Sequence, residues 1–169
     1  MENFEHSEIS RELKDIYDAD QQERIHKTWE TEPEEFWKRE AIRLDRVTKL
    51  IQQGALRDPG DYLHAAMILQ HSRESQHYQL AHEFSKKAAD EGYEPQEGEV
   101  NPLWLAAAAK DRYLMSLGKP QLYGTQSKKG ADGKWYLYET DPAVTDEERK
   151  KWHVPTLEEQ KRQIEEMNK

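Results

Sequence analysis

The sequence predicts a mainly α-helical protein, with a helical core over residues 8–117, a β-hairpin over 119–140 and two short helices within 141–169. Three observations predict this class. Apolar residues recur at helical spacing through the first part of the chain. Two short aromatic-rich runs then flank Gly130-Ala131-Asp132-Gly133, as expected for a hairpin turn. Finally, two Thr-x-x-Glu sequences near the C-terminus are typical of helix starts.

The first two helices are expected over residues 8–27 and 33–53. Thr31 is the candidate cap of the second helix, and Gly54 is its natural end. The apolar residues that should form their buried faces are Ile9, Leu13, Ile16 and Tyr17 in the first helix and Trp37, Leu44, Val47 and Ile51 in the second.

Three further helices complete the expected core, over residues 61–71, 75–91 and 102–117. The first of these follows the turn Asp58-Pro59-Gly60. The last follows Asn101 and has Pro102 in its first turn, where the missing N–H of proline costs no helical hydrogen bond. Gly92 and Gly118 follow the second and third of these helices as end signals.

The C-terminal part of the chain is expected to begin with two strands, over 121–127 and 134–139. Two short helices should follow over 145–152 and 156–167, each begun by a threonine with glutamate three residues later. The last helix alternates acidic and basic residues and is expected on the surface.

Composition limits the function classes. At 169 residues the chain has the length of one domain, taken as 1–169. Its formal charge of -9 disfavours nucleic acid and anionic membranes as partners. It has no cysteine, which excludes thiolate chemistry. The polar N-terminus and the lack of a long apolar run favour a cytoplasmic protein with no membrane segment.

Asp20 and Arg24 continue the apolar face of the first helix, four residues apart. A buried carboxylate needs a cation, and Arg24 is the nearest candidate. The alternative is an exposed ion pair on the helix surface.

Asp111 has the apolar helix neighbours Ala107, Ala108, Leu114 and Met115. It should therefore be buried, hydrogen-bonded and paired with a cation from the first helix or a histidine from the third. Arg112 points about 100° away from it, as adjacent helix residues do. The alternative is a structural carboxylate that ties two helices together.

Four histidines occur between residues 64 and 82. His71 should face inward, His82 should be half-buried, and both could approach one site if their helices pack as a hairpin. No His-x-x-x-His spacing occurs, so no metal site and no cofactor are expected. A buried histidine near Asp111 would suit acid–base chemistry at neutral pH, or could be a satisfied core residue.

Gln121 and Gln126 lie in the segment that follows the fifth helix. Their amides both donate and accept hydrogen bonds, so they are candidates for orienting a polar ligand. Alternatively, the turn at Gly124 is only chain geometry.

Two resemblances follow from these residues. Residues 81–92 are similar to the second helix of a Sel1-like tetratricopeptide repeat. The repeat-like match as a whole covers about one and a half repeats. Four further motifs are Asp-Gln-x-x-Arg24, Asp-Tyr-x-x-Ala-Ala-Met-Ile-Leu-Gln-His71, Asp111-Arg-Tyr-Leu-Met and Gly118-Lys-Pro-Gln-x-Tyr-Gly-Thr-Gln126. Through these motifs the chain resembles a bacterial domain family of unknown function with Sel1-like helix pairs. This resemblance covers about residues 10–160 and implies no activity. It implies antiparallel helix pairs and places in the family pattern the residues Asp20, Arg24, His71, Asp111, Arg112, Gln121 and Gln126. The acidic stretch 94–101 departs from a regular repeat.

Two functions from different classes are expected. The first is an enzyme without a cofactor, of hydrolase, lyase or isomerase type, acting on a small polar or anionic molecule. In this enzyme His71 moves the proton, and Asp111 or Asp20 orients the ring of His71. Arg24 or Arg112 binds an anionic group, while Gln121, Gln126 and His82 complete the substrate site. The second is an adaptor that binds another protein through its helical-repeat surface, with the buried polar residues serving only the structure. The candidate exposed aromatics for this binding are Trp135, Tyr136 and Tyr138 of the hairpin.

Overall fold

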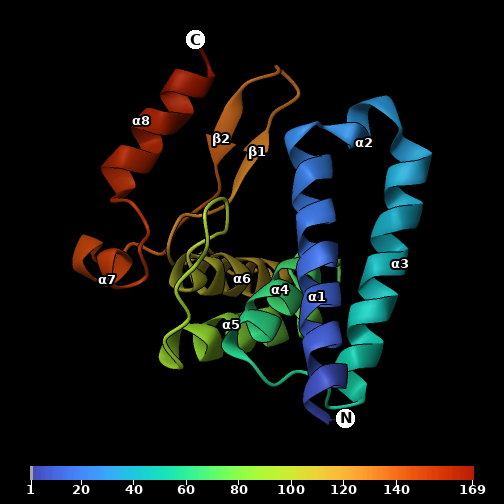
Figure 1. Ribbon diagram of the computed structural model, residues 1–169. Helices are drawn as coiled ribbons and strands as arrows, with labels where there is room; N and C mark the ends of the chain where they lie inside the picture. Colours follow the sequence, from blue (N-terminus) through green and yellow to red (C-terminus); the bar gives the residue numbers. More distant parts are fainter. Residues whose placement is uncertain (1) are drawn as a thin grey trace.

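A pair of long helices begins the chain in the computed structural model, which describes residues 2–169. These helices, α1 (Glu2–Ile25) and α3 (Pro33–Gln52), run antiparallel and are joined by the single turn α2 (Thr28–Thr31) (Figure 1). Helix α1 starts earlier than predicted. The cap of α3 is Glu32 rather than Thr31, because Pro33 already occupies the first helical position and Thr31 belongs to α2.

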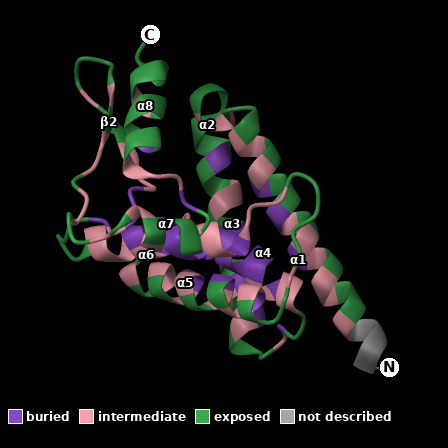
Figure 2. Cartoon of the chain, turned by 90° about the vertical axis from the view of Figure 1, so that its left-hand side faces the viewer, coloured by how far each residue is buried: buried purple, intermediate pink, exposed green. Residues whose placement is uncertain are grey.

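The middle of the chain forms three packed helices: α4 (Pro59–Leu69), α5 (Ser75–Asp90) and α6 (Pro102–Ser116). Asp58 and Asp61 form a capping box at the start of α4, and the Asn101 side chain caps α6 as predicted. Helix α4 lies between α1 and α5, so nearly all of its residues are buried (Figure 2).

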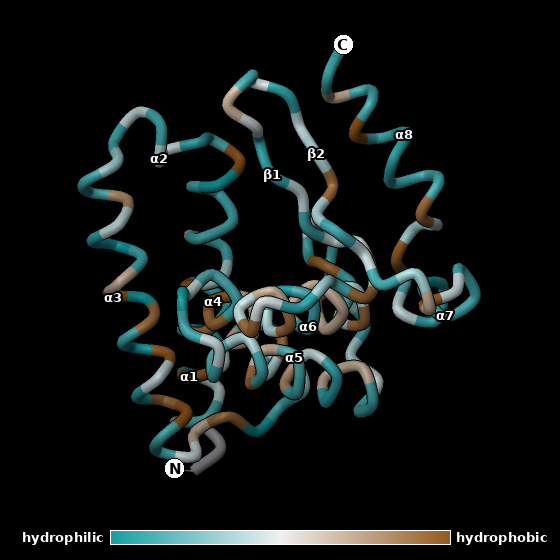
Figure 3. The backbone as a smooth tube through the Cα atoms, turned by 180° about the vertical axis from the view of Figure 1, so that it is seen from behind, coloured by the Kyte–Doolittle hydropathy of each residue, from teal (hydrophilic) through white to brown (hydrophobic). Residues whose placement is uncertain are grey.

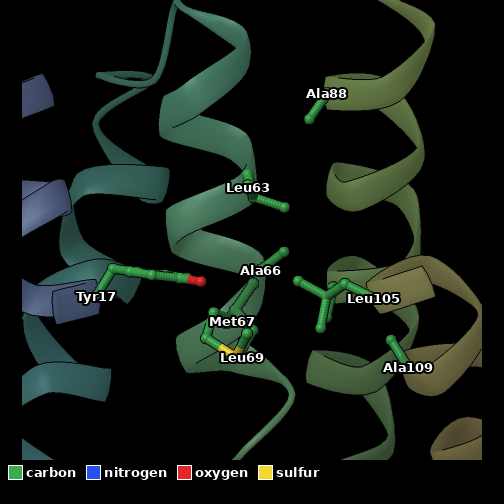
Figure 4. Close-up of a cluster of buried hydrophobic side chains, with 9 residues drawn as sticks. Tyr17, Leu63, Ala66, Met67, Leu69, Ala88, Leu105 and Ala109 are labelled. Atoms are coloured by element: carbon green, nitrogen blue, oxygen red, sulfur yellow. The ribbon is translucent and has the colours of Figure 1, made fainter. Parts of the chain in front are cut away.

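The core has two main parts that meet on α4. The first is rich in alanine, which lets α4, α5 and α6 approach closely; its members are Tyr17, Leu63, Ala66, Met67, Leu69, Ala81, Ala88, Leu105 and Ala109 (Figure 4). The second joins α1, α3 and α4 through Leu13, Val47, Leu50, Leu56, Ala65 and Ile68. The hydroxyl of Tyr17 also accepts a hydrogen bond from the backbone N–H of Val100, at 3.2 Å.

The predicted buried face of α3 is confirmed at Val47 and, with partial burial, at Leu44 and Ile51, but it is wrong at Trp37, because the stripe begins one position earlier. Trp37 is 48% exposed, whereas its neighbour Phe36 is buried together with Arg43, Val47 and Leu50. Adjacent helix positions differ by about 100°, so the shift turns Trp37 outward. The sequence analysis therefore missed Arg43 as a buried residue.

The C-terminal region contains the predicted hairpin, but the expected first strand, 121–127, is wrong except at its last residue, because residues 122–125 form a loop held by Asp111. Strand β1 (Ser127–Lys129) pairs antiparallel with β2 (Trp135–Leu137). Helices α7 (Asp146–Lys151) and α8 (Leu157–Met167) follow, and the Thr145 and Thr156 side chains cap them as predicted. Helix α8 is mostly hydrophilic and lies beside β2 (Figure 3). The mainly α-helical class, the hairpin and the two terminal helices are thus confirmed. Within the described part of the chain, no helix combines the length and apolar character needed to cross a bilayer.

Candidate functional site

Asp20 is the centre of a buried charge cluster between α1 and the end of α4. Its side chain is 1% exposed, and its Oδ2 lies 3.1 Å from Nε of Arg24 and 3.1 Å from Nδ1 of His71. The side-chain amide of Gln21 donates to the same oxygen at 2.9 Å. The predicted burial of Asp20 and its pairing with Arg24 are confirmed, and the exposed surface pair is excluded.

Helix α3 supplies a second layer of charges that the sequence analysis missed. Glu40 accepts a hydrogen bond from Nη2 of Arg24 at 3.2 Å. Nη2 of Arg43 lies 3.9 Å from Asp20 and 2.7 Å from Glu23. Arg43 stands four residues before Val47 on the buried stripe of α3, so helical spacing could have found it.

The surroundings shift the pKa values of this cluster in different directions. Burial opposes ionisation of Asp20, but His71 and Arg24 outweigh it and hold the pKa of Asp20 at about 2. Burial lowers the pKa of His71, although Asp20 acts in the opposite sense. Burial raises the pKa of Glu40, and the charge of Asp20 adds to this. At neutral pH the cluster therefore contains an ionised Asp20 beside a neutral His71.

The contacts of His71 fit one tautomer. Its side chain is 10% exposed, and its Nε2 lies 2.8 Å from the amide nitrogen of Gln70, which can only donate. A neutral ring with its proton on Nδ1 fits this contact and places the N–H 3.1 Å from Asp20, at an angle outside the usual hydrogen-bond range. The lone pair of Nε2 is then the basic position of the ring.

Arg112 adds a cation without an anionic partner. It is half-buried, its Nε has no hydrogen-bond partner, and among the described residues no carboxylate lies within 4.0 Å of its guanidinium. Burial lowers its pKa, whereas a hydrogen bond to Tyr78 acts in the opposite sense, and the charge of Arg24 lowers it further. The positive charge of Arg112 also lowers the pKa of His71, so Arg112 lies within electrostatic reach of the Asp20 cluster.

Asp111 is buried, as predicted, but its predicted cationic partner is wrong. Its Oδ1 accepts from the backbone N–H groups of Leu122 (2.7 Å) and Tyr123 (3.0 Å). Its Oδ2 accepts from both the backbone N–H and the hydroxyl of Thr125, at 3.0 and 2.7 Å. This carboxylate fixes the 122–125 loop onto α6 and is the structural kind that the sequence left as an alternative.

The two glutamines serve mainly the same loop. Gln121 is fully buried; its Nε2 donates to the carbonyls of Gln126 and Tyr138, and its Oε1 accepts from the N–H of Gln126. All of these are protein contacts, so Gln121 is not placed to orient a ligand. Gln126 donates to the hydroxyl of Thr125 and lines a small cavity beside α8.

His82 does not join the cluster. Its Nδ1 lies 2.8 Å from the carbonyl oxygen of Ala106, and its ring packs on Trp152. Burial lowers its pKa. The expectation that His82 and His71 approach one site fails because His82 faces α6 and α7 instead.

The hairpin aromatics of the adaptor hypothesis differ in exposure. Tyr136 is 44% exposed, whereas Trp135 and Tyr138 are partly buried. The backbone N–H and carbonyl of Trp135 are both bonded to Asn168, which ties the hairpin to the end of α8.

Comparisons of the chain with protein-family models, with curated proteins and with solved structures find no match.

Proposed function

We propose that the chain is an acid–base enzyme acting on a small anionic substrate, with His71 as the base and Arg112 as the anion-binding residue. The observation that favours this is the half-buried guanidinium of Arg112, which has no carboxylate partner among the described residues and whose charge acts on His71, the histidine 3.1 Å from Asp20. A cation in this setting gains most from an anion supplied by a ligand.

In this proposal each charged group has one role. Nε2 of His71 receives the substrate proton, because Nδ1 faces Asp20. The amide of Gln70 now donates to Nε2, and the substrate replaces it. Asp20, ionised at any pH above about 2, orients the ring and stabilises the imidazolium that forms. Arg24 is already occupied by Asp20 and Glu40, so its role is to hold the cluster in place.

The first experiment separates binding from chemistry. A panel of small carboxylates and phosphate esters is tested by thermal shift on the wild type, Arg112→Gln and His71→Asn. At least one compound should raise the melting temperature of the wild type and of His71→Asn but not of Arg112→Gln. The matched control is Arg73→Gln, which removes an exposed arginine that packs over Trp37 and should leave the shift unchanged.

The second experiment measures turnover of the compound that binds. His71→Asn should lower the rate at least about 100-fold, the usual contribution of a positioned base. Wild-type turnover should fall as the pH drops through the pKa of His71, which lies below the ordinary histidine value of about 6.5. The proposal is wrong if His71→Asn changes neither binding nor turnover.

A further inference from the structure

A second group of ligating side chains lies where the start of α1 meets the turn before α4. Nε2 of His6 is 2.9 Å from Oδ2 of Asp58 and 3.9 Å from Oδ2 of Asp61. One ligand atom from each of the three residues lies within 4.8 Å of the others. Around an ion with bonds of about 2.1 Å, ligand atoms are separated by about 3–3.5 Å. The three side chains therefore need only small adjustments to share one ion.

Asp61 is held in place before any ligand binds. Its side chain is 2% exposed, and its Oδ2 accepts from the backbone N–H groups of Arg57 (3.0 Å) and Asp58 (3.1 Å). Contacts of this kind orient a carboxylate for a metal and reduce the entropy that binding must overcome. They also belong to the capping box of α4, so capping alone explains the position of Asp61 but not the approach of His6.

A cavity of about 380 Å³ lies beside this group and supplies an independent observation. Asp58, Asp61 and His64 line it, together with Lys14 and Tyr93. His64 is 6% exposed; its Nε2 lies 2.9 Å from Glu99, but its buried Nδ1 has no hydrogen-bond partner. Buried polar atoms normally have a hydrogen-bond partner, so the unpaired Nδ1 of this cavity-lining histidine indicates room nearby for water or a polar ligand.

We propose that His6, Asp58 and Asp61 bind one divalent transition-metal ion of the zinc or manganese class. One imidazole and two carboxylates suit such ions, whereas Mg²⁺ prefers oxygen ligands alone. Three protein ligands leave coordination positions open for water or for a molecule in the adjoining cavity. The site is separate from the Asp20 cluster, since fourteen residues of α1 span about 21 Å.

The test is calorimetric titration of the chelator-treated chain with Zn²⁺ and, separately, with Mg²⁺. Zn²⁺ should bind at one site per chain, and much more tightly than Mg²⁺. His6→Ala and Asp58→Asn should each weaken Zn²⁺ binding at least tenfold. Asparagine is as good a helix cap as aspartate, so Asp58→Asn removes the charge while α4 keeps its start.

Matched controls separate this site from surface binding of zinc. His26→Ala removes an exposed histidine in the turn that follows α1, and Asp90→Asn removes an exposed aspartate at the end of α5. Both should bind Zn²⁺ like the wild type. The proposal is overturned if His6→Ala binds Zn²⁺ as tightly as the wild type, if Mg²⁺ binds equally well, or if the controls weaken binding as much as the ligand variants.

Discussion

Asp20 and Asp111 are both buried helix carboxylates, 1% and 0% exposed, but the protein stabilises their charges in different ways. Asp20 faces cations and a titratable ring, which come from α1, α3 and the turn after α4. Asp111 faces only hydrogen-bond donors of one loop, which do not titrate. Burial of a carboxylate therefore does not by itself indicate a reactive site. The identity of its partners separates a group that could take part in proton transfer from one that organises the backbone.

Substitution of Asp111 should have the largest effect on stability. Asp111→Ala leaves the N–H groups of Leu122, Tyr123 and Thr125 without their acceptor, at about 1–3 kcal/mol for each donor that stays buried. With three such donors, we expect a total loss of about 3 kcal/mol or more in urea unfolding. Asp111→Asn keeps an acceptor oxygen and should lose less. Asp90→Ala, at an exposed position, is the control, and an Asp111→Ala protein as stable as that control would contradict the structural role.

Asp20 should give a smaller effect that depends on pH. A pKa lowered from 3.8 to about 2 corresponds to about 2 kcal/mol of stability. Because the folded-state value is the lower one, this stability is present above pH 3.8 and disappears as the pH falls toward 2. The difference between the wild type and Asp20→Asn in urea unfolding should therefore shrink across that interval. A difference that stays constant from pH 6 to pH 2.5 would show that Asp20 contributes through shape rather than charge.

His71 should give the smallest effect, in a higher pH range. Burial lowers its folded-state pKa, so the unfolded chain binds the proton more readily and stability falls as the pH drops below about 6.5. His71→Asn should lack this part of the pH dependence. The same unfolding measurements between pH 8 and 5 test this, with His26→Ala as the exposed control. Equal slopes for the wild type and His71→Asn would place the titration elsewhere.

The sequence predicted which residues are buried better than it predicted their partners. Helical spacing placed Asp20 and Asp111 on apolar faces because a helix fixes the direction of each side chain. It also gave Arg24 as a partner of Asp20, because residues four apart on a helix are neighbours. The partners of Asp111 were missed because they are backbone groups of a loop whose path depends on the whole C-terminal region. Gln121 was misjudged for a related reason, since an amide can satisfy the chain as well as a ligand.

The proposed metal ligands show a further limit of spacing arguments. His6 and Asp58 are 52 residues apart and meet only because α1 packs against the start of α4. Motif searches detect ligands that one helix or turn brings together. They do not detect ligands that come together only through the tertiary fold.

The hydrogen bond from Val100 to Tyr17 has a consequence for the order of folding. It joins positions 83 residues apart, whereas α4, α5 and α6 contact their neighbours across short connections. Long loops cost more entropy to close, so contacts across them form after the local helix pairs have packed. We therefore expect α1, paired with α3 across the short α2 connection, to complete its contacts with the α4–α6 unit after that unit has packed. Because α1 provides both Asp20 and His6, the two proposed sites should then be completed late in folding.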